Sequence, residues 1–281
     1  MSFDMMNIRI KNMASQRSWM EAIRIIIEKG ISLDKLRIAE VGCGTGTTAL
    51  SFALMGSSVT LIDFNQKALG LAKAIYQMYG CQPELINADC LQVPEDKLRE
   101  NFDLVVSSGL MEHFSGNLRI QCLIYHKDLL KTGGFAHISV PNKACPWYQI
   151  VRLFRMLTKT WEIDVEVPFS ARELNIMSEK AGFKSHYVIH NGEWSGDFKY
   201  YARGFVSAVG DILPWPIRNI IKGWKTGLAA KRIDDQGSAE DVRLYLRDRL
   251  SQARDLFSIK PIKPGYTNQF NSDLALLAFK S

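Results

Sequence analysis

The chain has 281 residues, of which 47% are hydrophobic, 10% aromatic and 23% charged. This composition provides ample apolar material for a core and excludes disordered and fibrous classes of protein. Since domains usually hold on the order of 100–200 residues, the length allows one enlarged domain or two. The formal net charge of +6 allows an anionic partner without selecting one.

Cysteine spacing and apolar runs indicate where the protein resides. The five cysteines form an odd set without a CxxC pair, which argues against a disulfide framework and against a zinc site. No stretch reaches the roughly 18 uninterrupted apolar residues of a membrane span, and the N-terminus carries no cleavable leader pattern. We therefore expect a cytoplasmic protein with reduced thiols and no metal site, with a peripheral position at a membrane as an alternative.

The first 142 residues alternate between helical and extended patterns. Apolar residues at helical spacing predict an amphipathic helix over 14–29, with Gly30 as its stop. Short apolar runs then predict strands at 36–41, 58–63, 83–87, 102–107 and 134–140, separated by helices at about 45–55, 65–79, 95–100 and 117–130. Continuous apolar strands are typical of a parallel sheet buried on both faces. The pattern predicts a doubly wound α/β domain.

The alternation stops after Pro141. A mixed apolar and basic segment follows, and then Ser170 and Glu173 form a capping-box pattern for a helix that Gly182 ends. A strand is predicted at 183–190, a charged helix near 239–256, and a last strand in DLALLAFK, which starts at Asp273.

The segment IAEVGCGTG, Ile38 to Gly46, is the most informative part of the sequence. Gly42, Gly44 and Gly46 allow a tight turn in which the backbone approaches a ligand. Asp63 ends the second strand 21 residues beyond Gly42, where a carboxylate can accept hydrogen bonds from both hydroxyls of a ribose. The two features predict a nucleoside cofactor; a glycine turn that binds nothing is the alternative.

Two residues near the loop bear on which nucleoside it binds. The dinucleotide pattern GxGxxG needs glycine or alanine at position 47, where this chain has Thr47. Glu40 would face the diphosphate of NAD or FAD at an electrostatic cost. S-adenosylmethionine has no phosphate and carries an ammonium and a sulfonium, so the acid favours it. An NAD-dependent dehydrogenase is the remaining rival.

The ordered motifs resemble those of class I S-adenosylmethionine-dependent methyltransferases. The matching segments are EVGCGTG, LIDFN, NADC (87–90), FDLVVSSGLMEHF (102–114) and LLKTGGFAHISVPN (129–142). In motif style they are most similar to the ubiquinone-type O-methyltransferases, which carry a similar Glu-His step. The resemblance implies a Rossmann-like, doubly wound, seven-stranded mixed sheet with helical or irregular inserts that form a substrate cover.

The resemblance also implies how the chain is divided. It predicts an N-terminal helix or cap (1–31), a cofactor-binding core (32–142), an insert after the fifth strand (143–169), completion of the core sheet (170–190 and 273–281) and a substrate-side insert (191–272).

Cofactor contacts follow from the same resemblance, with S-adenosylhomocysteine as the product. Gly42, Gly44 and Gly46 would line the methionine, and Glu40 would interact with it directly or through water. Asp63 would hold the ribose, and Phe64 would pack on the adenine. Asp89, next to Ala88, would meet the adenine amino group, and Ser107 and Ser108 would expose backbone carbonyls to the methionine amine.

Methyl transfer is an in-line displacement, so catalysis rests chiefly on alignment of the acceptor. An oxygen or nitrogen acceptor also loses a proton, and His113 is the best-placed general base because imidazole titrates near neutrality. The alternative is that Glu112 and His113 hold the loop or wall the cofactor pocket. The chain reads SSGL, 107–110, where adenine and cytosine methyltransferases carry an Asn/Asp-Pro-Pro-aromatic motif, which argues against a nucleic-acid substrate.

Aromatic and basic residues gather in the two predicted inserts. Residues 143–161 carry about +4 and residues 203–232 about +5. These segments predict docking on an anionic membrane or on an amphipathic substrate. The alternative is that Trp147, Ile150, Val151, Phe154 and Leu157 face the core while the basic residues are solvated. The substrate-side candidates are Trp147, Tyr148, Trp194, Tyr200 and Tyr201.

These observations predict a methyltransferase that acts on an oxygen or nitrogen of a small-molecule acceptor. A membrane-surface methyltransferase of a lipid, quinone or lipid-linked sugar is one alternative. A non-catalytic cofactor-binding or scaffold protein is the alternative from another class.

Overall fold

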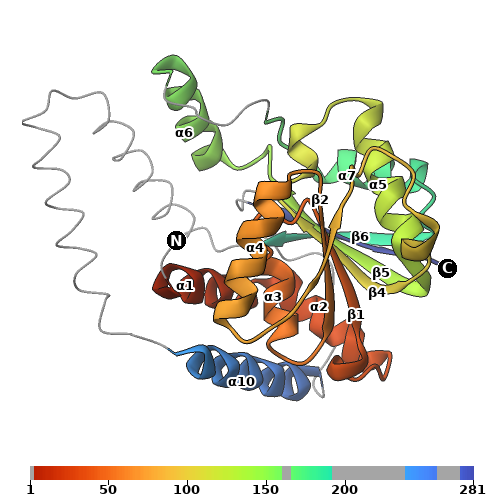
Figure 1. The fold of residues 1–281 in the computed structure, drawn as a ribbon. Helices are drawn as coiled ribbons and strands as arrows, with labels where there is room; N and C mark the ends of the chain where they lie inside the picture. Colours follow the sequence, from red (N-terminus) through yellow and green to blue (C-terminus); the bar gives the residue numbers. More distant parts are fainter. Residues whose placement is uncertain (1–2, 160–165, 192–237, 258–272) are drawn as a thin grey trace, which may run out of the picture.

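The computed structural model describes residues 3–159, 166–191, 238–257 and 273–281. Its centre is a seven-stranded sheet with the order β3-β2-β1-β4-β5-β7-β6 (Figure 1). The strands are β1 (Arg37–Val41), β2 (Ser58–Asp63), β3 (Glu84–Asn87), β4 (Phe102–Ser108), β5 (Leu130–Pro141), β6 (Ser185–Asn191) and β7 (Asp273–Phe279). All neighbours are parallel except β7, which runs antiparallel to both β5 and β6. The predicted mixed seven-stranded sheet is confirmed.

Helices cover both faces of this sheet because side chains alternate along each strand. Ile38 joins one buried core and Ala39 the other. The first face carries α1 (Phe3–Ala14), α2 (Arg17–Glu28), α3 (Thr47–Ala53), α4 (Gln66–Met78) and α10 (Ala239–Phe257), and the second carries α5 (Asn117–Leu129) and α7 (Ala171–Lys180). Because helices cover both faces, we expect a ligand to bind at the carboxyl ends of the strands, as in other open α/β sheets.

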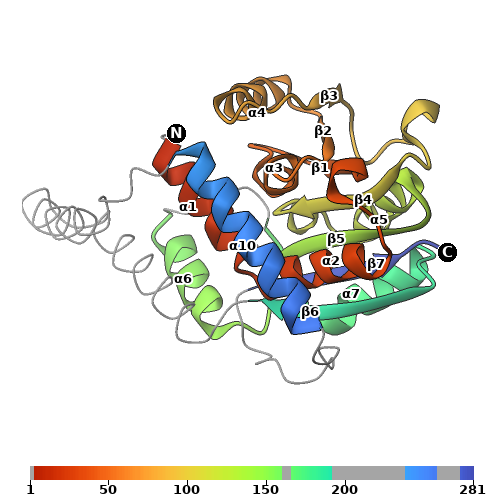
Figure 2. The same ribbon diagram turned by 90° about the horizontal axis from the view of Figure 1, so that it is seen from below.

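The N-terminal region differs from its prediction. The single helix expected over 14–29 is α2, and a separate helix, α1, precedes it. α1 lies beside α10, as Figure 2 shows, and buries Met6 and Ile10 in the same core as Val242 and Leu246. Part of the segment expected as a substrate-side insert thus packs on the N-terminal helices.

Helix α6 (Pro146–Leu157) stands away from the sheet (Figure 1). Tyr148 and Val151 are buried, whereas Ile150, Leu153 and Leu157 are 50%, 59% and 74% exposed. The alternative in which this helix faces the core holds for Val151 and is wrong for Ile150 and Leu157, because the helix contacts the fold along one narrow stripe. Among the described helices, none is both long and apolar enough to cross a bilayer.

Candidate cofactor site

The glycine loop joins the carboxyl end of β1 to the start of α3. Gly42, Gly44 and Gly46 have φ values of +61°, +50° and +67°, in the left-handed region that favours glycine. A Cβ on Gly42 would lie 2.5 Å from Leu110 Cδ1, whereas a Cβ on Gly44 would meet no atom of the described residues within 4 Å. Gly42 is therefore packed against the protein, and Gly44 presents its backbone to open space.

Asp63 connects this loop to the end of β2. Its Oδ2 accepts a hydrogen bond from the Gly44 N–H at 2.9 Å, and its Oδ1 accepts one from the Asn65 N–H at 2.8 Å. A carboxylate offers about four lone-pair sites, so both oxygens keep acceptor capacity for a ligand. Phe64 follows directly and is 76% exposed, an unusual state for a phenyl ring.

Glu40 lies below the loop and is 3% exposed. Its Oε2 accepts a hydrogen bond from the Ala49 N–H at 2.8 Å, so the carboxyl meets the first turn of α3. Burial raises its pKa to about 7, against the lowering effect of the hydrogen bonds from Ala49 and Thr48. The carboxyl thus supports the loop from within, and its contact with a methionine stays a prediction.

The adenine candidates lie at the end of β3, which pairs with β2 in the register Asp63↔Asn87. Asn87 Nδ2 donates to the carbonyl oxygens of Asp63 and Phe64, at 3.0 and 2.9 Å. Ala88 is half-buried, and the exposed Asp89 accepts from the Leu91 N–H through Oδ1. The sheet therefore brings the predicted ribose and adenine residues to one edge.

Ser107 and Ser108 end β4, beyond the last residue pair that β1 and β4 share, Glu40↔Val106. The Ser107 side chain points inward and contacts His126 Nε2 at 3.0 Å. His126 Nδ1 lies 2.7 Å from the Cys122 carbonyl, which can only accept, so Nδ1 carries the proton and Nε2 accepts from the Ser107 hydroxyl. The β4 end therefore offers backbone groups at Ser107, not its hydroxyl.

His126 is a site-supporting residue that the sequence motifs do not indicate. It is fully buried, and burial lowers its pKa to about 4, so it stays neutral at physiological pH. Its spacing of four residues from Cys122, on the core face of a predicted helix, is the one sequence signal that points to it.

The predicted catalytic step lies on a short 3-10 helix, η3 (Met111–His113), which follows β4. His113 is exposed, whereas Glu112 is only 4% exposed. The Val167 N–H donates to the Glu112 carbonyl at 2.9 Å, which ties η3 to the segment that precedes α7. The His113 side chain therefore faces solvent, whereas the Glu112 side chain is buried in the protein.

Of the substrate-side candidates, Trp147 and Tyr148 lie at the start of α6. Trp147 is half-buried, and the buried Tyr148 donates its hydroxyl hydrogen to Glu166 Oε1 at 2.6 Å. Trp194, Tyr200 and Tyr201 lie outside the described residues.

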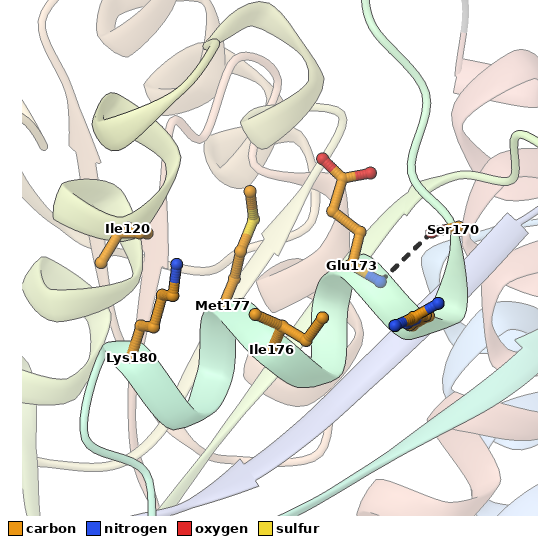
Figure 3. A pocket seen from close by; sticks show the side chains of 7 residues that line it. Ile120, Ser170, Glu173, Ile176, Met177 and Lys180 are labelled. Carbon is orange, nitrogen blue, oxygen red and sulfur yellow. Dashed lines mark hydrogen bonds between the residues drawn. The ribbon is translucent and has the colours of Figure 1, made fainter.

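A hollow of about 240 Å³ lies elsewhere, between α5 and α7 (Figure 3). Ile120, Met177 and Lys180 are among its lining residues, and none of the predicted cofactor residues lines it. At its rim Ser170 Oγ accepts from the Glu173 N–H at 3.2 Å, as the capping pattern predicts, while the Glu173 carboxylate pairs with Arg119 at 2.6 Å. The hollow is therefore separate from the glycine loop.

Comparison with known proteins shows which proteins this chain resembles. Residues 38–134 match the family model described as a methyltransferase domain. The ubiquinone biosynthesis O-methyltransferase of Rickettsia prowazekii is 33% identical over 126 residues, 43% of this chain and 48% of the relative. Residues 38–134 thus match a methyltransferase domain, and the chain is similar to S-adenosylmethionine-dependent methyltransferases. The corresponding Dechloromonas aromatica protein is 30% identical over 117 residues, 42% of this chain and 49% of its own length.

The chain spans about half the length of the curated relatives it matches. Solved structures show the same fold for the methyltransferase domain. An S-adenosylmethionine-dependent methyltransferase from Thermotoga maritima has a TM-score of 0.51 at 13% identity and covers 94% of this chain and 90% of its own. Magnesium protoporphyrin IX methyltransferase from Synechocystis, with bound S-adenosylhomocysteine, has a TM-score of 0.50 at 17% identity and covers 70% and 84%.

Proposed function

We propose that the protein transfers a methyl group from S-adenosylmethionine to an oxygen or nitrogen of a small-molecule acceptor. The observation that carries this proposal is the open backbone at Gly44, which Asp63 holds in place beside the exposed ring of Phe64. This combination suits an uncharged nucleoside linked to a chain of methionine size. None of the proposed cofactor residues carries a cationic group that would neutralise a diphosphate. When bound, the cofactor supplies an electrophilic methyl group on a sulfonium.

The chain's own residues would bind and orient the two reactants. Backbone groups of the glycine loop and of the β4 end would hold the methionine, Asp63 the ribose, and Phe64 one face of the adenine. Because His126 fixes Ser107, the β4 backbone is already ordered before a ligand arrives, which reduces the entropic cost of binding. His113, exposed on η3, is the base proposed from the sequence. The full set of proposed cofactor contacts is Glu40, Gly42, Gly44, Gly46, Asp63, Phe64, Ala88, Asp89, Ser107 and Ser108.

Ligand-induced stabilisation tests the cofactor. We expect S-adenosylhomocysteine to raise the melting temperature, since a ligand present at 100 times its Kd stabilises the folded state by about 2.7 kcal/mol. We expect NAD at the same concentration to leave it unchanged. Stabilisation by NAD instead would contradict the proposal and support a dehydrogenase.

Transfer itself is tested with methyl-labelled S-adenosylmethionine and a panel of phenols and primary amines. Label in the extracted acceptor supports the enzyme. A protein that binds S-adenosylhomocysteine but labels no acceptor, with or without lipid vesicles, would be a non-catalytic cofactor-binding protein.

The exposed face of α6 favours a second candidate, a methyltransferase that acts at a membrane surface. Ile150, Leu153 and Leu157 are three and four residues apart, so they share one side of the helix. The segment 143–159 carries Lys143, Arg152, Arg155 and Lys159 without an acid. An apolar stripe flanked by cations suits an anionic bilayer interface. A lipid, a quinone or a lipid-linked sugar would then be the acceptor.

Vesicle co-sedimentation tests this second candidate. We expect the protein to sediment with vesicles that contain phosphatidylglycerol. The L153E/L157E double variant should bind about a hundredfold more weakly or less, because burying each leucine contributes about 1.5–3 kcal/mol and about 1.4 kcal/mol is a tenfold change in affinity. Leu118→Glu is the matched control, since Leu118 is an exposed leucine on α5 (43%) outside the stripe. Equal binding by the double variant, or no binding by the unmodified protein, would remove the membrane proposal.

A further inference from the structure

Glu112 places a carboxyl group beside the loop that leaves β4. A Cβ built on Gly109 would lie 3.5 Å from Glu112 Oε1, so the carboxyl lies against the backbone of Gly109. The next residue, Leu110, packs on Gly42 of the glycine loop. The segment from Ser108 to Glu112 therefore runs from the proposed methionine site to this carboxyl.

The Glu112 carboxyl is buried and incompletely satisfied. The residue is 4% exposed, and its Oε2 has no hydrogen-bond partner among the residues that the structure describes. A buried polar atom without a partner costs about 1–3 kcal/mol, so a protein rarely keeps one without a use. Because this oxygen is shielded from solvent, a hydrogen-bond donor on the acceptor would satisfy it after a rotation of the Glu112 side chain.

The charges around Glu112 come from several elements. Two other carboxyls act on it, Glu166, which accepts from Tyr148, and Asp273 at the start of β7. Arg119 of α5 is the opposing cation, but its guanidinium already pairs with Glu173 at 2.6 Å and lies 3.6 Å from the centre of the Phe169 ring. Burial first, and then the neighbouring carboxyls, raise the pKa of Glu112 to about 7.

We propose that Glu112 Oε2 is the atom that takes the proton from the methyl acceptor. This proposal rests on the proposed methyltransferase function. The acceptor's oxygen or nitrogen forms a bond to the methyl carbon while the carbon–sulfur bond breaks and its electron pair stays on sulfur. The proton that the acceptor loses passes to Glu112, which then releases it to solvent. Glu112 replaces His113 in this role, because a buried carboxyl can receive a proton where water is excluded.

Sinefungin tests the proposal without knowledge of the acceptor. This analogue carries a primary ammonium in place of the S-methyl group, so its ammonium points at the site of the acceptor, where a nearby carboxylate would attract it. We expect the protein to bind sinefungin more tightly than S-adenosylhomocysteine, and Glu112→Gln to lose roughly tenfold or more of that preference. The affinity of Glu112→Gln for S-adenosylhomocysteine should match that of the unmodified protein, which shows that the fold and the cofactor site are intact.

Two further variants, Glu173→Gln and His113→Ala, test whether the effect is specific to Glu112. Glu173→Gln is the matched control, because it removes a carboxylate that pairs with Arg119 and is not among the groups that shift the pKa of Glu112, and it should keep the sinefungin preference. If Glu112→Gln keeps the preference, or if His113→Ala alone abolishes it, the assignment of the proton acceptor to Glu112 is overturned. Failure of the unmodified protein to bind S-adenosylhomocysteine would instead overturn the proposed function on which this assignment rests.

A stability measurement tests the buried carboxyl if Glu112→Gln changes the affinity for S-adenosylhomocysteine. A folded-state pKa raised from 4.5 to about 7 means that unfolding releases a proton between these pH values, so stability falls as pH rises through this window. Burial also raises the pKa of Glu40, so the pH dependence of stability contains a contribution from that residue as well. The contribution of Glu112 is therefore the difference in stability between the unmodified protein and Glu112→Gln. We expect the advantage of the unmodified protein over Glu112→Gln to shrink from pH 4.5 to 7. A constant difference would contradict a proton-accepting carboxyl at this place.

Discussion

Replacing Asp63 by alanine is expected to weaken S-adenosylhomocysteine binding by about 10- to 150-fold, the equivalent of about 1.5–3 kcal/mol for hydrogen bonds to a charged group. Two causes act together. The variant loses the proposed contact with the ribose, and it also loses the acceptor that holds the Gly44 N–H at 2.9 Å. Isothermal titration calorimetry measures the change directly.

Asp63→Asn separates the two causes. An amide keeps one carbonyl oxygen but places an NH₂ group against either the Gly44 or the Asn65 N–H, so we expect an intermediate loss of affinity. Asp34→Ala serves as the control, since this exposed carboxylate lies before β1, away from the loop. If Asp63→Ala binds as tightly as the unmodified protein, the ribose assignment is wrong.

Replacing Gly46 by alanine should produce a large loss of stability. Gly46 has a φ of +67°, which costs a residue with a Cβ about 1–2 kcal/mol. Its Cβ would also lie 2.9 Å from Tyr76 and 3.0 Å from Leu61, and overpacking in a core costs about 1–3 kcal/mol. We expect urea denaturation to show a total loss of about 2–5 kcal/mol.

Gly30→Ala is the matched control for the steric part of this effect. Gly30 has the same φ of +67°, but a Cβ there would meet no atom within 4 Å in the part of the chain that the structure describes. The loss of stability in Gly30→Ala should therefore reflect the backbone conformation alone. Equal losses in the two variants would show that the core around Tyr76 yields to the added methyl group.

Local patterns were sufficient to predict most of the sheet. The strands β1, β2 and β4 are continuous apolar runs that are buried on both faces, which is a strong signal in a single sequence. Helix α1 was not predicted because Asn7 is one of its buried residues, and its packing partner α10 starts at Ala239. An apolar pattern interrupted by a polar residue becomes a stable helix only through this distant contact.

In the candidate site, too, features that depend on local sequence could be predicted, whereas contacts between distant elements could not. The glycine loop and Asp63 were predictable because each depends on the backbone of a few consecutive residues. The contact of His126 with Ser107 joins residues 19 apart, and the environment of Glu112 depends on Glu166 and Asp273. Such arrangements arise when separate elements meet at the ends of the strands. The spacing of Cys122 and His126 indicates only that they share a helix face, and no spacing in the sequence indicates which residues of other elements they contact.

The position of β7 has a consequence for the synthesis of the protein. β7 lies between β5 and β6, yet about 80 residues separate it from β6 along the chain. The ribosome therefore synthesises β5 and β6 well before β7, which pairs with both. Until β7 emerges, β5 and β6 each expose unpaired backbone groups along a strand edge. Nascent chains that stop before residue 273 should aggregate unless a chaperone shields these strands, whereas full translation lets Asp273–Phe279 close the sheet.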